Sequence, residues 1–550
     1  MSKSFVKWLG ICMALSMVLL TACTGNNSDA GTAGDGKALA KEQVLNVGSI
    51  PSEPPGLDPL KARDSASGLI LSQLMEGLTK TDTEGKALPG IATKWEANKD
   101  SSQFTFHLRD AKWSNGDPVT AVDFEYAWKR MLDPKNAAIY AYQLFYLKNG
   151  EKYNQGKAKV DDVGVKAVDD KTLKVTLERP TPYFPSLAAF YALFPVNKKV
   201  AEADKKWAGD AKTFVSNGAF KMKEWKHNAK IVLEKNEKYY NKKKTKLTQI
   251  NFPFVTDTKT GYQQFQSGEL DEGDSNLIPT DLTKSLIEKK EAKGGPNPAS
   301  YGIDFNTKKK PFTNANIRRA FALAIDRQSI VENVTQAGQE PANGWVPWGM
   351  PDFSTKDDWV KNHDKYLDAK ANASEAKKLL EKGLKEEKID KLPKVTFSYN
   401  TDDGHKKIAE ALQQMWKDNL GVDVKLANME WKVFLEKKSS GDYDMARTGW
   451  LPDYIDPMTF MDLYMTGSGQ NDAKFNNKEF DKLIKEAKST DNQDKRMKSM
   501  HKAEDILMKE MPVAPLYWYT RLHMQKDYVK NVKRSIDGTV YYTEAYLTEH

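Results

Sequence analysis

Segments with the hydrophobic period of a strand and of a helix interleave along the chain from about residue 45 onward. Residues 104–108 and 173–177 alternate apolar with polar side chains, which predicts half-buried strands. Apolar residues recur at helical spacing over 317–334 and 405–420, so each segment is predicted to form one helix. This interleaving is typical of the α/β or α+β class.

The end of the second predicted helix is marked in the sequence. Gly421 follows residues 405–420 and fits the left-handed position that often ends a helix. Residues 422–426 then alternate as in a strand. We therefore expect a helix, a tight cap and a strand in close succession here.

The first 22 residues have the pattern of an export signal. Lys3 and Lys7 precede an apolar run over 8–20, which is shorter than the roughly 20 residues needed to span a bilayer. Residues 20–23 resemble a bacterial lipobox ending in Cys23. We expect a signal peptide over 1–22 and a lipid on Cys23; the alternative is an ordinary secretory signal followed by an unrelated cysteine.

Composition bounds the remainder of the chain. The sequence has 550 residues and two cysteines, Cys12 and Cys23, so removal of the signal would leave no internal disulfide. The polar, glycine-rich segment 24–44 is predicted to be a flexible tether. The segment from residue 45 to the C-terminus is too long for one hydrophobic core, so two or three domains are expected.

The sequence shows no sign of an enzyme. The net charge of +8 is spread over 83 basic and 75 acidic residues, with no basic and aromatic stripe typical of nucleic-acid binding. No two of the seven histidines stand at i,i+3 or i,i+4, and no common nucleophile or zinc motif occurs. We expect no catalysis, no cofactor, no metal and no nucleic-acid partner.

Residues 443–460 carry the most informative pattern. Arg447 and Gly449 would share an otherwise apolar strand face, and Asp453 follows in a loop after Pro452. A buried arginine needs an anionic partner, and a zwitterionic peptide would bring one together with a cation for Asp453. The alternative is an internal ion pair between Arg447 and Asp453.

Three long stretches resemble the large solute-binding proteins of peptide ABC transporters. These are residues 104–134, 305–327 and 404–435, and the resemblance extends from about residue 45 to the C-terminus. It implies an α/β, two-lobed, hinge-closing fold of the periplasmic-binding-protein type with an extra domain in the first lobe. The implied division is a first lobe (45–65, 191–298 and 521–550), an inserted domain (66–190) and a second lobe (299–520).

The resemblance also implies a peptide site between the lobes. Asp453 would receive the peptide ammonium, and Arg447 or His405 would receive its carboxylate, depending on peptide length. The main chain around Gly449 and Trp450 and that of Ser52, Glu53 and Pro54 would lie beside the peptide. Trp431, Trp450 and Tyr519 would wall its side-chain pockets. Without the resemblance, Trp431 and Tyr519 would be interpreted as core residues, and His405 could equally well be a surface residue at the start of a helix.

The sequence departs from the family pattern in several places. Thr335 stands where the family has a carboxylate-binding lysine, and Lys438 replaces an accessory arginine. Two positions that form a disulfide in some relatives hold Ala299 and Leu451, and Pro54 is followed by a second proline. These changes affect the end of the site that would hold the peptide carboxylate and leave Asp453 in place.

The expected protein is a monomeric lipoprotein on the extracytoplasmic face of a cell membrane. It would bind short peptides with a free N-terminus and deliver them to ABC permease subunits, touching the membrane only through its lipid. Two alternatives stay open: a receptor of the same fold for a different ligand, and a peptide sensor that does not transport.

Overall fold

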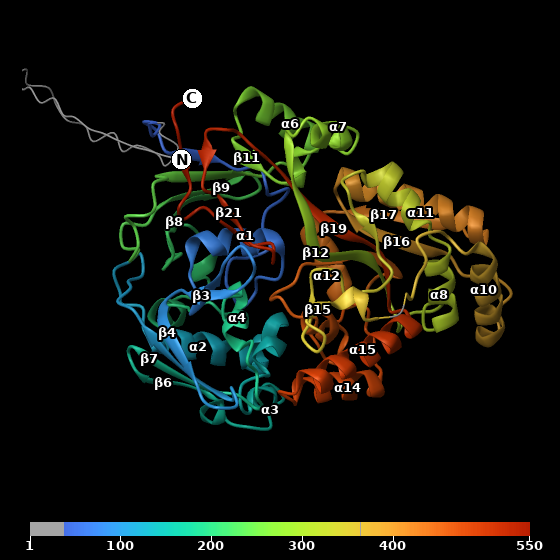
Figure 1. Cartoon of the computed structure of the whole chain (residues 1–550), viewed down its shortest axis with the longest axis horizontal. Helices are drawn as coiled ribbons and strands as arrows, with labels where there is room; N and C mark the ends of the chain where they lie inside the picture. Colours follow the sequence, from blue (N-terminus) through green and yellow to red (C-terminus); the bar gives the residue numbers. More distant parts are fainter. Residues whose placement is uncertain (1–37, 364) are drawn as a thin grey trace, which may run out of the picture.

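The computed structural model describes residues 38–363 and 365–550. The predicted signal peptide and Cys23 lie outside the described residues. Within the described part, no helix is both long enough and apolar enough to cross a membrane. The chain forms two halves that face each other, with the blue-to-green segments in one half and most of the yellow-to-orange segments in the other (Figure 1).

A four-stranded sheet forms the first lobe. Its order is β1 (Val44–Asn46), β10 (Gln249–Pro253), β9 (Lys230–Lys235) and β8 (Phe220–Lys226), and only the β1–β10 pair is parallel. The same half contains α1 (Ser65–Leu74), α5 (Lys198–Ala203), α6 (Thr258–Ser267), α7 (Thr283–Glu288), β20 (Val529–Lys530), β21 (Lys533–Arg534), β22 (Val540–Tyr541) and β23 (Tyr546–Leu547).

The inserted domain has its own four-stranded antiparallel sheet. The order is β4 (Ala92–Ala97), β5 (Gln103–Leu108), β7 (Thr172–Thr176) and β6 (Val165–Asp169). The alternation predicted over 104–108 is confirmed, because every second residue of β5 is buried. Around this sheet lie β2 (Thr79–Thr81), β3 (Ala87–Pro89), α2 (Ala121–Leu132), η2 (Ile139–Leu144), α3 (Gly150–Asn154), α4 (Phe184–Leu187) and η4 (Tyr191–Leu193).

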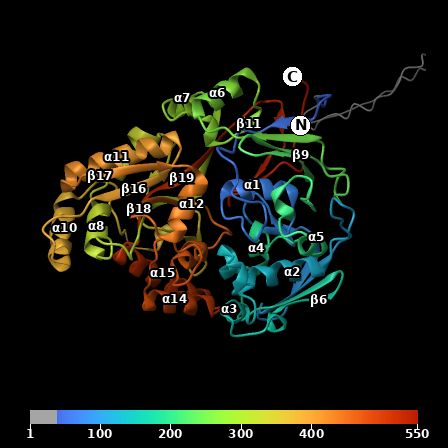
Figure 2. The same cartoon turned by 180° about the vertical axis from the view of Figure 1, so that it is seen from behind.

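The second lobe is built on a seven-stranded sheet. Its order is β11 (Glu272–Gly273), β19 (Val513–Gln525), β12 (Ala292–Phe305), β18 (Met445–Trp450), β16 (Val395–Asn400) and β17 (Val424–Met429), with β13 (Glu340–Pro341) also paired to β19. Its helices are α8 (Ala315–Leu323), α10 (Ala373–Glu387), α11 (Asp403–Leu420), α12 (Trp431–Ser440), α13 (Met458–Met461), α14 (Lys478–Lys488) and α15 (Gln493–Glu510). Helices α10 and α11 lie on its outer side (Figure 2).

The two halves are joined by the long strands β12 and β19, which run from β11 into the second lobe (Figure 1). Their pairing shifts in register between Pro296 and Ser300. The predicted lobe boundaries, after residues 298 and 520, fall inside these strands. A continuous pair of strands therefore connects the lobes at this position.

The helix predicted over 317–334 is wrong as a single element. The chain instead forms α8, α9 (Arg327–Ser329) and a π-helical turn over Ile330–Thr335. Asp326 starts the new helix by accepting from the Ser329 N–H at 2.8 Å. The buried Arg327 guanidinium donates to the carbonyls of Ala322 and Ile325 at this break. A buried charge thus terminates a helix that apolar periodicity alone would extend.

The helix predicted over 405–420 is confirmed as α11, with Gly421 at φ 69° as its cap. The predicted tether, in contrast, extends too far. Ala40 N donates to Leu547 O at 2.9 Å, and the buried Gln43 side chain bonds both the N–H and the carbonyl of Leu547. Residues 38–43 therefore pack against the C-terminal segment instead of belonging to a free tether.

Candidate functional site

A cavity of about 860 Å³ lies between the lobes. Residues of all three parts line it, including Ser52 of the first lobe, Tyr140 of the inserted domain and Arg447 of the second lobe. Ligands that are enclosed by hinge closure are bound in such a space. The cavity is therefore the candidate site.

The cavity brings together most of the residues predicted from the sequence. Nine line it: Ser52, Glu53, His405, Trp431, Arg447, Gly449, Trp450, Asp453 and Tyr519. Pro54 is buried and is not among the residues that line the cavity. The expectation that its main chain lies beside the peptide stays a prediction.

Asp453 lies just beyond the end of β18 and is partly exposed to the cavity. Its Oδ2 accepts a hydrogen bond of 2.6 Å from Gln143 Nε2, and its backbone N–H donates to Thr459 Oγ1 at 3.1 Å. Among the described residues, no cationic group lies within 4 Å of its carboxylate. Burial, and after it the nearby carboxylate of Asp462, raise the pKa of Asp453 well above its usual value, whereas the bond from Gln143 lowers it.

Arg447 occupies the middle of β18. Its Nε donates to Asn400 Oδ1 at 2.7 Å, and its guanidinium lies 5.1 Å from the ring centroid of Trp431 and 5.4 Å from that of Phe434. No carboxylate of the described chain lies within 4 Å of the guanidinium. The alternative of an internal ion pair between Arg447 and Asp453 is therefore wrong for this structure, which presents both charges unpaired.

His405 lies in the first turn of α11. Its backbone N–H donates to Asp402 Oδ1 at 2.8 Å, which caps the helix, and its Nδ1 lies 3.2 Å from the Tyr301 hydroxyl. Burial, and then the charge of Arg447, lower the pKa of His405 to about 4. His405 is thus a neutral group in the cavity wall, and its interpretation as a surface histidine is wrong.

Three aromatic residues form parts of the wall. Trp450 Nε1 donates to Thr459 Oγ1 at 3.3 Å, so the same hydroxyl holds both Trp450 and the backbone of Asp453. The ring of Tyr519 packs edge-on against Tyr301, with centroids 5.9 Å apart. Trp431 and Tyr519 are only half buried, so both face the cavity and neither is a core residue.

Gly449 leaves room for one of these aromatic residues. A Cβ at this position would lie 2.9 Å from the Tyr519 hydroxyl, closer than van der Waals contact allows. The absence of a side chain at Gly449 therefore lets Tyr519 approach this strand closely.

On the first-lobe side, the carboxylate of Glu53 is engaged within its own lobe. It pairs with His227 and accepts from the Asn228 N–H at 2.8 Å. The Glu53 carboxylate is therefore already occupied by partners of its own lobe.

Lys438 is not a free cation. Its Nζ lies 2.8 Å from Asp304 Oδ2 and 3.5 Å from Asp472 Oδ2, and it donates to Thr448 Oγ1 at 3.1 Å. Burial raises the pKa of Asp472, and Lys438 opposes that shift. The charge of Lys438 is thus already paired within the protein.

Sequence reasoning missed several residues that shape the site. Asp402 could have been found, because an aspartate directly before a predicted helix favours an N-cap. Asn400 and Gln143 carry no such signal, since each acts on a residue far away in the chain. Within the described residues, no three His, Cys, Asp or Glu are arranged to hold a metal ion.

Comparison with known proteins assigns the chain to a family. Residues 86–472 match the model of the bacterial extracellular solute-binding proteins, family 5 Middle. The chain belongs to this family. Its members are binding proteins, and the fold is the family's two-lobed one.

The oligopeptide-binding protein OppA of Bacillus subtilis is 46% identical over 547 residues, covering 97% of this chain and 98% of that protein. The structure of Listeria monocytogenes OppA bound to peptide is 37% identical and superposes with a TM-score of 0.87, covering 93% of this chain and all of the other. The similarity therefore spans both lobes and the inserted domain.

A third relative indicates how the lobes are arranged. The Escherichia coli murein tripeptide binding protein MppA, 34% identical, superposes with a TM-score of 0.85 and covers 93% of this chain and all of that one. The unliganded open form of MppA, at the same identity, reaches only 0.62, with coverage of 94% and 99%. The lobes of the present structure are thus arranged as in the peptide-bound relative, not as in the open form.

Proposed function

We propose that this protein binds short peptides with a free N-terminus between its lobes and delivers them to the permease subunits of an ABC transporter. The observation that carries the proposal is the unpaired Asp453 carboxylate in the cavity. Keeping a charge out of water without a partner costs several kcal/mol. A ligand with an ammonium group would supply the missing partner, and its carboxylate would do the same for Arg447.

In this proposal Asp453 receives the peptide ammonium. Arg447 receives the carboxylate of shorter peptides, and His405 offers a neutral hydrogen bond toward longer ones. The main chain at Gly449 and Trp450 and at Ser52 and Glu53 pairs with the peptide backbone, as in strand addition. Such pairing supplies affinity without reading the peptide sequence.

The walls of the cavity would accept peptides with different side chains. Trp431, Trp450 and Tyr519 offer flat apolar surfaces, and the volume of the cavity leaves room for bridging waters. Thr335, which donates to Gln339 Oε1 at 2.9 Å, gives no positive charge to the far end. Arg447 is therefore the cation assigned to the peptide carboxylate.

The membrane attachment is also part of the proposal. A lipid on Cys23 would anchor a monomeric protein to the extracytoplasmic face of the cell membrane, near its permease. A Cys23→Ala variant should be released from the membrane fraction of cells that express it. Retention of that variant would contradict lipid anchoring while leaving peptide binding untouched.

Mass spectrometry of the ligands that are released from the purified protein tests the binding function. We expect a set of short peptides with free amino termini. A single sugar, haem or bile-acid species would overturn the proposal in favour of a receptor for a different ligand.

Uptake by a deletion strain separates transport from sensing. We expect cells without the protein to lose growth on an essential amino acid that is supplied as a tripeptide. Unchanged growth on the tripeptide would contradict the transport role.

A further inference from the structure

Three consecutive residues of the second lobe are held by the inserted domain. Asp453, the first of them, accepts the 2.6 Å bond from Gln143 of η2. Gln143 is fully buried, and its Oε1 has no hydrogen-bond partner among the described residues. Its amide therefore connects the inserted domain directly to the carboxylate in the cavity.

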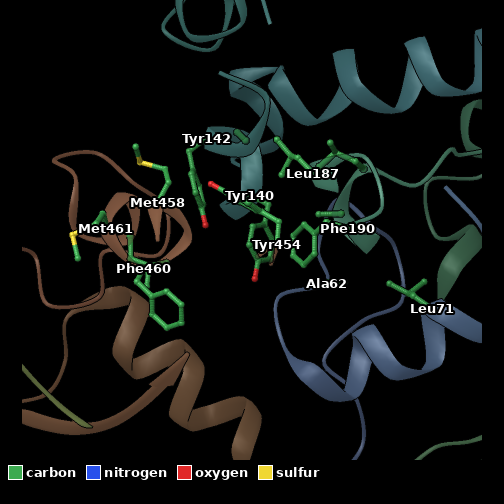
Figure 3. Close-up of a cluster of buried hydrophobic side chains, with 14 of the residues drawn as sticks. Ala62, Leu71, Tyr140, Tyr142, Leu187, Phe190, Tyr454, Met458, Phe460 and Met461 are labelled. Carbon is green, nitrogen blue, oxygen red and sulfur yellow. The ribbon is translucent and has the colours of Figure 1, made fainter. Parts of the chain in front are cut away.

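Tyr454 is held through its ring and its hydroxyl. Its ring stacks on that of Tyr183, with centroids 5.7 Å apart and planes at 6°, and its hydroxyl lies 3.4 Å from that of Tyr146. Tyr183 also donates to the Tyr146 hydroxyl at 3.2 Å. Tyr454 lies in the same buried cluster as Tyr140 of the inserted domain (Figure 3).

Two cations of the second lobe lie against these rings. The Arg496 guanidinium lies 4.7 Å from the centroid of Tyr183 and is held by two bonds to Asp456, at 2.7 and 2.8 Å. Lys488 Nζ lies 5.0 Å from the centroid of Tyr146. Cations over aromatic faces add attraction across this contact between domains.

Two glycines allow the backbones to approach. A Cβ on Gly85 of the inserted domain would overlap Ile455, the third residue of the segment. A Cβ on Gly469 of the second lobe would overlap the carbonyl oxygen of Ile139 in η2. The contact is thus close enough at both sides of residues 453–455 that one methyl group would separate the surfaces.

We propose that the inserted domain is part of the binding device, with Gln143 as a positioning residue for Asp453 and the contacts of Tyr454 as a latch that holds the lobes closed around a ligand. This inference rests on the proposed peptide-binding function. It assigns the inserted domain a role that the cavity lining alone does not reveal.

The latch and the ammonium site occupy neighbouring residues, which is the reason they are coupled. In an open arrangement, such as that of unliganded MppA, the second lobe would move away from the inserted domain and Asp453 would lose Gln143. Closure would restore both the bond and the tyrosine stack. A ligand that binds Asp453 in its oriented state would therefore favour closure.

The charges around Asp453 support this coupling. The groups that face it are the carboxylates of Asp462 and Asp537 and the hydroxyls of Tyr140, Tyr142 and Tyr191. None of these is a cation, and donation from Gln143 is the contact that lowers the pKa of Asp453. Loss of Gln143 should therefore favour the protonated acid, which cannot pair with an ammonium group.

The first test is Gly469→Ala in the full chain without its signal peptide, with Gly209→Ala as the control because a Cβ there meets nothing within 4 Å. Calorimetry with trialanine should show at least about tenfold weaker binding for Gly469→Ala, since a clash opposes closure. X-ray scattering should show less compaction on adding trialanine. Wild-type affinity and full compaction in Gly469→Ala would overturn the latch.

The second test is Gln143→Met, which keeps the volume and removes the donor. We expect trialanine binding to weaken about tenfold at pH 6 and less at pH 8, because the acid form of Asp453 must lose its proton before it binds. A pH profile parallel to that of the wild type would overturn the role of Gln143, even if the variant were less stable. If the wild type itself bound no trialanine, the proposed function would fail instead of this inference.

Discussion

Asp453 is held across the lobe boundary by Gln143, whereas Arg447 is held by residues of its own lobe. Asn400, Trp431 and Phe434, which fix Arg447, all belong to the second lobe. In the proposed function, the site for the peptide ammonium is therefore completed by closure, whereas the site for the peptide carboxylate is already formed in the second lobe. The proposal thus predicts a strict requirement at the peptide N-terminus and tolerance at its far end.

The largest effect is expected at Asp453, whose site we propose is completed when the lobes close. Asp453→Ala should weaken trialanine binding by about 2–5 kcal/mol, because the ligand ammonium would be buried without its counter-ion. Calorimetry measures this loss, and Asp491→Ala, at an exposed position of the same lobe, serves as the control. An affinity within about twofold of the wild type would refute the assignment of Asp453.

The next largest effect is expected at Arg447. Arg447→Met should cost about 1.5–3 kcal/mol with trialanine, since the peptide carboxylate loses charged hydrogen bonds. With trialanine amide, which has no carboxylate, wild type and variant should bind nearly equally. An equal loss for both peptides would mean that Arg447 supports the site without contacting the ligand carboxylate.

His405 should have a smaller effect that does not change with pH in the neutral range. His405→Gln should cost about 0.5–1.5 kcal/mol for a longer peptide such as pentaalanine, as expected for one neutral hydrogen bond. The cost should be the same at pH 6 and pH 8, because the pKa of about 4 keeps His405 uncharged at both. A cost that grows on acidification from pH 8 to pH 6 would show that His405 acts as a cation.

The stability of the ligand-free protein should also depend on His405. Its pKa falls from the usual 6.5 to about 4 on folding, so the unfolded chain binds more protons between these values. The contribution of neutral His405 is present above pH 6.5 and is lost as the pH falls toward 4. Thermal unfolding at pH 5 and pH 7 should show a smaller difference in Tm for His405→Gln than for the wild type; an equal difference would contradict this.

The smallest effect on peptide affinity is expected at Pro54, which is not among the residues that line the cavity. Pro54→Ala should change trialanine affinity by less than about twofold, since its side chain does not reach the lining. A larger loss would indicate that the first-lobe strand moves on binding.

Local patterns of the sequence predicted the elements that carry the site. The alternation in β5, the helical period of α11 and the cap at Gly421 depend on neighbours in the chain, and all are confirmed. The break after α8 was missed because it depends on the buried charge of Arg327, whose guanidinium also reaches Pro515 O at 2.8 Å. The spacing of apolar residues along the chain carries no information about such a contact.

The residues of the site likewise fall into two groups: those that the sequence indicated and those that only the folded chain brings together. The residue types at Arg447 and Asp453 allowed either a zwitterionic ligand or an internal ion pair, and the resemblance to a family favoured the ligand and supplied most of the cavity wall. Gln143 could not be inferred, because it meets Asp453 only after the inserted domain and the second lobe, 310 residues apart in the sequence at this contact, have come together. The packing of residues 38–43 against Leu547 likewise depends on the far end of the chain.

The central claim is that a free peptide ammonium is bound by Asp453. Calorimetry of the wild type with trialanine and with N-acetyl-trialanine at pH 7 tests it most directly, because acetylation removes the charge and leaves the remaining peptide unchanged. We predict tight binding of trialanine and binding at least about thirtyfold weaker for the acetylated peptide. Equal affinity for the two peptides would contradict the claim.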